Sequence, residues 1–119
     1  MARARRERPR APSSEYSDAE GGMIVLRGAL SPATRASYAR IASAEDLPPG
    51  ASREDAWQRA VEFLFERLAV SWTIAGLPPL RGQRQLLARL RVASVGERAW
   101  LRDCLREHCA AHFPDIAAP

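Results

Sequence analysis

Apolar side chains in the middle of the chain recur at spacings of three and four, which is the pattern of a helix with one buried face. The recurring residues are Trp57, Ala60, Val61, Leu64, Leu68 and Trp72. Phe63 and Phe65 widen the apolar surface beyond this face. We therefore expect a long helix that is covered on two sides, by its own domain and by another chain.

Capping residues predict where the helices begin. Ser52 with Asp55, and Ser94 with Glu97, have the spacing of capping boxes, so they predict the starts of the long helix and of a last helix. Ser31 is a good N-cap and is followed by a proline, which fits the first helical position. Helices are expected over about residues 32–42, 53–75, 80–92 and 95–112.

The N-terminal part of the chain lacks a helical pattern. Met23 to Leu30 is a short apolar run, but no partner strand is visible, and an isolated strand is not stable. We predict an extended segment outside any sheet. Residues 1–22 have almost no apolar content and are expected to form a disordered or extended basic arm. Residues 23–119 are then expected to form one all-α domain of about four packed helices.

The net charge of +4 comes from the N-terminal arm. Residues 1–12 hold five arginines and one glutamate, while the remaining 13 arginines are balanced by 13 acidic residues. A nucleic-acid groove needs positive charge gathered on a folded surface, and the body of the chain has no such excess. We also expect no membrane span, no secretory signal and no disulfide framework, and the cytoplasm is the expected compartment.

Four residues near the end of the last predicted helix carry groups that bind metals or act in catalysis. They are Cys104, His108, Cys109 and His112. Thiolates and imidazoles are ligands for zinc and copper, and Cys104 and His108 also have the spacing of a nucleophile and its base. However, all four come from one helix, and the cysteines fall on its apolar face, where a thiol packs as a small hydrophobe. Packing and metal binding both stay open, and no metal is assigned to this chain.

Four arginines crowd the third predicted helix: Arg81, Arg84, Arg89 and Arg91. They form either a solvated helix face or a group from which one side chain reaches an interface and binds an oxyanion. A guanidinium suits that second role because it makes bidentate hydrogen bonds to anionic oxygens.

The order of several short motifs resembles the N-terminal helical part of the nitrile hydratase beta subunit, and of the similar separate subunit of thiocyanate hydrolase. The resemblance covers about residues 18–113. Its motifs are Asp18-Ala19-Glu20-Gly21-Gly22-Met23, Trp57-Gln58-Arg59-Ala60, Gly76 with Arg84 eight residues later, and Glu97-Arg98-Ala99-Trp100-Leu101-Arg102.

The resemblance implies a small non-catalytic subunit of a hetero-oligomeric lyase that converts a nitrile to an amide. Its partners would be an alpha-type metal-binding subunit and a second beta-type subunit, and the small nitrile would bind at the shared interface. Cobalt or iron would sit in the alpha-type subunit, with no cofactor in this chain. By analogy, Arg84 would hydrogen-bond the oxidised cysteines around that metal. The expected interface side chains are Trp57, Phe63, Phe65, Trp72 and Trp100.

Two other classes of protein remain as alternatives. A helical adaptor or phage tail assembly chaperone without enzymatic activity needs only an exposed apolar helix face. A helical nucleic-acid-binding protein would use the arginines of residues 81–91 to contact phosphates.

Overall fold

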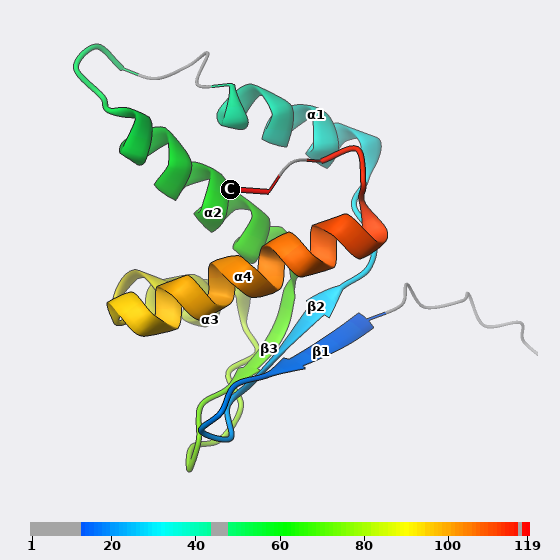
Figure 1. Cartoon of the computed structure of the whole chain (residues 1–119), viewed down its shortest axis with the longest axis vertical. Helices are drawn as coiled ribbons and strands as arrows, with labels where there is room; N and C mark the ends of the chain where they lie inside the picture. Colours follow the sequence, from blue (N-terminus) through cyan, green and yellow to red (C-terminus); the bar gives the residue numbers. More distant parts are fainter. Residues whose placement is uncertain (1–12, 44–47, 117) are drawn as a thin grey trace, which may run out of the picture.

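The computed structural model describes residues 13–43, 48–116 and 118–119 of the chain (Figure 1). The elements, in chain order, are β1 (Ser13–Ser17), β2 (Met23–Arg27), α1 (Pro32–Ala42), α2 (Arg53–Leu68), β3 (Ala69–Thr73), α3 (Gln83–Arg91) and α4 (Val95–His112). Residues 1–12, which carry most of the predicted basic arm, lie outside the described residues.

The all-α prediction is wrong, because three strands form an antiparallel sheet in the order β1-β2-β3. The apolar run after residue 22, predicted to lie outside any sheet, is its central strand. Ile24 pairs with Tyr16 on one side and with Trp72 on the other. Strand β1 comes from the segment predicted to be an arm. It was missed because its sequence, SSEYS, contains one aromatic and no aliphatic side chain.

Strands β1 and β2 are joined by a turn that the Asp18 side chain holds together. Its Oδ1 accepts hydrogen bonds from the backbone N–H groups of Glu20 (2.8 Å) and Gly22 (2.7 Å). Gly21 adopts a φ of 89°, which glycine reaches without steric cost. The turn chemistry was therefore present in the sequence, within a segment that the low apolar content had assigned to disorder.

Helix α2 ends at Leu68, about two turns before the predicted end, and the chain continues as β3. Gln83 accounts for part of this boundary, since its Nε2 donates hydrogen bonds to the carbonyl oxygens of Glu66 (3.4 Å) and Ala69 (3.2 Å). Trp72 then exchanges two backbone hydrogen bonds with Leu80, of 2.9 and 2.8 Å. Because Trp72 follows Leu68 by four residues, its burial fits a helical repeat as well as a strand, and periodicity alone could not separate them.

Three of the four predicted helix starts are confirmed, while α3 begins at Gln83 instead of residue 80, which pairs with Trp72. The hydroxyls of Ser52 and Ser94 accept hydrogen bonds from the N–H groups of Asp55 and Glu97, both at 3.1 Å. Both carboxylates bond back to the cap N–H at 2.9 Å, which completes two capping boxes. Ser31 caps α1 through the N–H of Thr34 at 3.1 Å.

One core joins the sheet to the helices. In Figure 1, α4 runs across α2, while α1 lies beside the N-terminal half of α2. Fully buried residues come from every layer: Ile24 and Leu26 of β2, Leu64, Phe65 and Leu68 of α2, Leu86 and Leu90 of α3, and Leu101 and Leu105 of α4. Each such side chain contributes about 1.5–3 kcal/mol when it leaves water. Within the described residues, no helix is long and apolar enough to span a bilayer.

Candidate functional site

The two cysteines of α4 are buried free thiols. Burial raises the pKa of Cys104 to about 12, with a smaller contribution from the Glu107 carboxylate, and raises the pKa of Cys109 to about 11. Both thiols therefore keep their protons at neutral pH, whereas the thiolate is the form that attacks carbon or binds metal. Among the described residues, no group of three or more His, Cys, Asp or Glu side chains is arranged to hold a metal ion.

His108 is fully buried, and both of its ring nitrogens are engaged. Its Nε2 lies 2.8 Å from the carbonyl oxygen of Arg27, which only accepts, so Nε2 carries the proton and donates. Nδ1 then accepts a hydrogen bond from the hydroxyl of Tyr16 at 2.9 Å. Burial lowers the pKa of His108 despite the opposing hydrogen bond to Arg27, and burial also raises the pKa of Tyr16. The pair is therefore a neutral imidazole that accepts from a neutral phenol.

His112 extends this arrangement by one helical turn. Its ring centroid lies 4.5 Å from that of His108, and its Nε2 lies 3.1 Å from the hydroxyl oxygen of Ser14. We call Ser14, Tyr16, His108, His112 and the Arg27 carbonyl the His108 cluster. The cluster ties β1 and the end of β2 to the last turns of α4, and its contacts mark it as structural.

The four arginines that were predicted to form one group differ in their contacts: two form salt bridges, and two form none with the described residues. Arg89 bonds to Glu97 at 2.6 Å, and Arg91 bonds to Glu62 at 3.1 and 3.2 Å. Arg81 and Arg84 are exposed at the start of α3, and neither forms an ion pair with any residue in the described ranges.

The aromatic residues predicted for an interface do not share one surface. Phe65 and Trp72 are 0% and 2% exposed and pack against each other in the core of the chain, so their rings are covered by the chain itself. Phe63 is half-buried between Tyr38 and the guanidinium of Arg67. The other two candidates, Trp57 and Trp100, are partly exposed. Trp100 borders a hollow of about 370 Å³ beside the β1–β2 turn.

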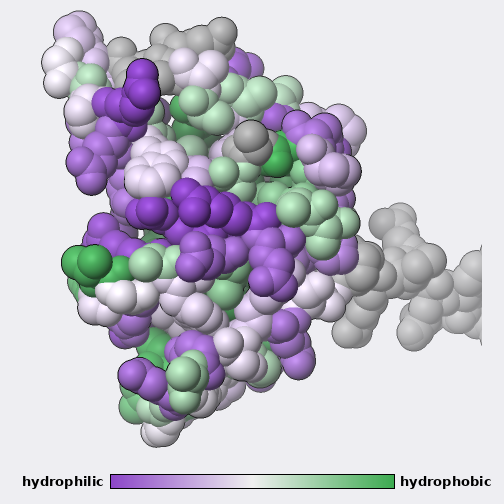
Figure 2. Space-filling view, viewed as in Figure 1, coloured by the Kyte–Doolittle hydropathy of each residue, from purple (hydrophilic) through white to green (hydrophobic). Residues whose placement is uncertain are grey.

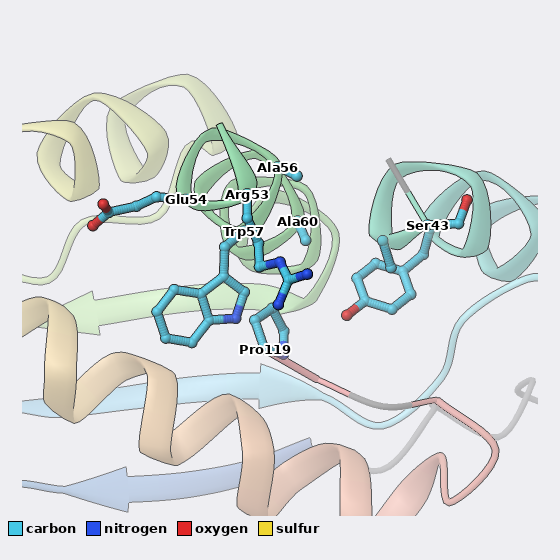
Figure 3. Close-up of a pocket in the computed structure, with 9 residues that line it drawn as sticks. Ser43, Arg53, Glu54, Ala56, Trp57, Ala60 and Pro119 are labelled. Carbon is cyan, nitrogen blue, oxygen red and sulfur yellow. The ribbon is translucent and has the colours of Figure 1, made fainter. Parts of the chain in front are cut away.

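Trp57 borders a larger cleft, of about 820 Å³, between the end of α1 and the first turns of α2 (Figure 3). We call this the Trp57 cleft. Its lining includes Tyr38 and Ala42 of α1, Arg53, Ala56 and Trp57 of α2, and Pro119 near the C-terminal end of the described chain. Figure 2 shows a hydrophilic band over the outer face of α4 and more apolar residues above it, on the side of α1. The cleft is therefore a mostly apolar hollow beside a charged ridge.

Helix α4 fixes the indole of Trp57 from its other side. The guanidinium carbon of Arg102 lies 3.8 Å from the indole centroid, and that of Arg106 lies 6.0 Å away. Arg106 also donates from Nε to the carbonyl oxygen of Pro119 at 2.6 Å, which holds the last described residue at the rim of the cleft. Contacts within the chain therefore hold this wall of the cleft in place.

Arg53 is a charged residue of the Trp57 cleft that forms no salt bridge within the part of the chain that the structure describes. In Figure 3 the guanidinium of Arg53 extends between Trp57 and Ser43 toward Pro119, while the carboxylate of Glu54 points away from them. No described side chain forms a salt bridge with Arg53. Sequence analysis named Trp57 but missed Arg53, because the approach of α1 to the start of α2 depends on tertiary packing that no local pattern reveals.

Comparison with known proteins adds no assignment: no family model, no curated protein and no solved structure matches this chain.

Proposed function

We propose that this chain is a small non-catalytic subunit that binds another protein, and that the Trp57 cleft is where it does so. The observation that carries this proposal is the cleft itself, a hollow of about 820 Å³ with mostly apolar walls and an arginine that forms no ion pair among the described residues. At protein interfaces, the side chains that contribute most to binding insert into such apolar hollows, and a few polar groups fix their orientation. Binding to another protein is common to two functions that the sequence suggested, namely a subunit of a hetero-oligomeric enzyme and a helical adaptor.

In the experiment, the wild-type chain and two variants are immobilised as baits and incubated with an extract of the cells that produce the protein. The proteins that each bait retains are then compared. A protein that binds through the cleft is retained by the wild-type chain and by an Arg59→Gln variant, whose change is exposed on α2, and is lost from a Trp57→Ala variant. The retained protein is then purified, and its affinity for the three baits is measured by calorimetry. Equal affinity for all three baits would show that the cleft is not the binding site.

Arg84 favours a more particular form of this proposal, a subunit of a nitrile hydratase-type complex. The exposed guanidinium at the start of α3 has the chemistry to bind the anionic oxygens of oxidised cysteines in a partner. Gln83 places this end of α3 beside the C-terminal end of α2, whereas Trp57 lies near the N-terminal end. Two partner subunits would then occupy two different ends of the molecule. The sheet weakens this form of the proposal, because the resemblance implied a helical unit.

The test of this form uses an assembled complex with a cobalt- or iron-containing subunit. Arg84→Lys keeps the charge but removes the bidentate contact, so nitrile turnover should fall at least tenfold, while Arg81→Lys should leave it unchanged. Turnover that Arg84→Lys leaves intact would remove the role of this arginine and leave the partner-binding proposal standing.

A further inference from the structure

We infer that the segment bound in the Trp57 cleft is an amphipathic helix of a partner protein, with apolar anchors and an aspartate or glutamate that pairs with Arg53. This inference rests on the proposed function and adds the chemistry of the partner. Three features of the cleft carry it: the shape of its floor, the character of its walls and the direction of its charge.

The floor of the cleft is made of small side chains. Ala56 and Ala60 lie one turn apart on α2 and are 8% and 2% exposed, so they form the bottom of the hollow. Ala42 faces them from the end of α1. Small residues between two packed helices leave a groove into which the side chains of a third helix can insert, at positions i, i+3 or i+4 and i+7.

The walls on either side of this floor are aromatic and held in place. Tyr38 is 3% exposed, and burial raises the pKa of its hydroxyl to about 12, so the ring stays neutral. Trp57 is stacked on Arg102 of α4. Rigid aromatic walls lose little conformational entropy on binding and are common anchors at protein interfaces.

Arg53 and Glu54 are the two charged side chains among the described residues that line the cleft, and Arg53 is the one that extends toward Pro119. Arg53 has no partner among the described residues, and the neighbouring Glu54 is directed away from it (Figure 3). Asp55 is already used in the capping box with Ser52, so it does not neutralise the arginine. Arg53 also lies in the first turn of α2, where the helix dipole favours an anion. A carboxylate on the incoming helix supplies the missing partner.

The experiment is a selection of helix-forming peptides of about 16 random residues, displayed on phage, against the purified full chain. Wild-type protein should select peptides with apolar residues at helical spacing and at least one acidic residue beside them. Arg53→Glu should select basic residues at the same place, and Arg59→Glu, the same charge change elsewhere on α2, should select as wild type does. Arg53→Glu is expected to fold, because a carboxylate in the first turn of a helix is favourable.

Synthetic versions of the selected peptides then give affinities by fluorescence anisotropy. Replacing the acidic residue by its amide should weaken binding to wild type at least fivefold and should not weaken binding to Arg53→Gln. Apolar peptides without an acidic residue, bound through Trp57, would overturn this inference and leave the proposed function intact. Peptides whose affinity is unchanged by Trp57→Ala would overturn both. Dimerisation of the chain itself, abolished by Trp57→Ala, would also overturn the inference, because the occupant would then be a second copy.

Discussion

The His108 cluster and the Trp57 cleft are both places where distant segments of the chain meet, and they differ in how their polar groups are satisfied. In the cluster, both ring nitrogens of His108 are paired within the chain, with Tyr16 and with Arg27. In the cleft, Arg53 forms no ion pair with any side chain of residues 13–43, 48–116 and 118–119. A buried polar group is stable only when it is paired, so the first region is complete as it stands. Arg53 is exposed, so water can solvate its guanidinium, and our proposal is that the carboxylate of a partner replaces this water.

The largest expected loss of stability comes from a substitution that disrupts the His108 cluster. His108→Ala leaves the Tyr16 hydroxyl and the Arg27 carbonyl without partners and opens a hole in the core, so the free energy of unfolding should fall by about 3–4 kcal/mol. Urea denaturation measures this loss. His112→Ala is the matched control one turn further along α4. Since His112 is only partly buried, this variant should lose less than half as much.

The same region should make stability depend on pH. His108 has a lowered pKa in the folded chain, so below pH ~6.5 the unfolded chain takes up a proton that the folded chain excludes. Stability should therefore fall as the pH drops from ~6.5, by at most about 1.4 kcal/mol per pH unit, until the folded-state pKa is reached. Other polar groups face His108: the Tyr16 hydroxyl from β1, the Arg27 carbonyl from β2 and the His112 ring from α4.

Denaturation midpoints at pH 7.5, 6.5 and 5.5 test this dependence. His108→Gln has no titrating ring, while its amide nitrogen can still donate to the Arg27 carbonyl, so its midpoint should change much less with pH. The capping carboxylates Asp55 and Glu97 have lowered pKa values, so stability that depends on their charge is lost only at more acidic pH. An equal slope in His108→Gln and wild type would assign the effect to another group.

The contrast between the two regions also explains what the sequence could predict. Helix starts depend on residues three apart, such as Ser94 and Glu97, and these were read correctly. The sheet depends on pairing between residues as distant as Ile24 and Trp72, and no local pattern contains that information. Likewise, Trp57 stood out as a large apolar residue, but Arg53 became a candidate only once α1 had been placed beside it.

Removing Trp57 from the wall of the Trp57 cleft should reduce the free energy of unfolding less than removing His108, although tryptophan is the larger side chain. Trp57→Ala loses the stacking with Arg102 and part of a half-exposed ring, so we expect a loss of about 1–2 kcal/mol in the free energy of unfolding. Thermal unfolding measures it beside His108→Ala. A loss as large as that of His108→Ala would show that Trp57 is a core residue, and that its effect on binding reports on folding.

The smallest effect on stability is expected at Arg53, although its substitution should still weaken binding. Arg53 makes no ion pair with the described residues, so Arg53→Gln should change the free energy of unfolding by no more than about 0.5 kcal/mol. The same variant should weaken a partner helix that carries a carboxylate. Arg91→Gln is the matched control, since Arg91 is committed to Glu62 within the chain. It should leave binding unchanged. A marked loss of stability in Arg53→Gln would mean that the guanidinium is already satisfied inside the chain, and the distinction between a closed cluster and an open cleft would no longer hold.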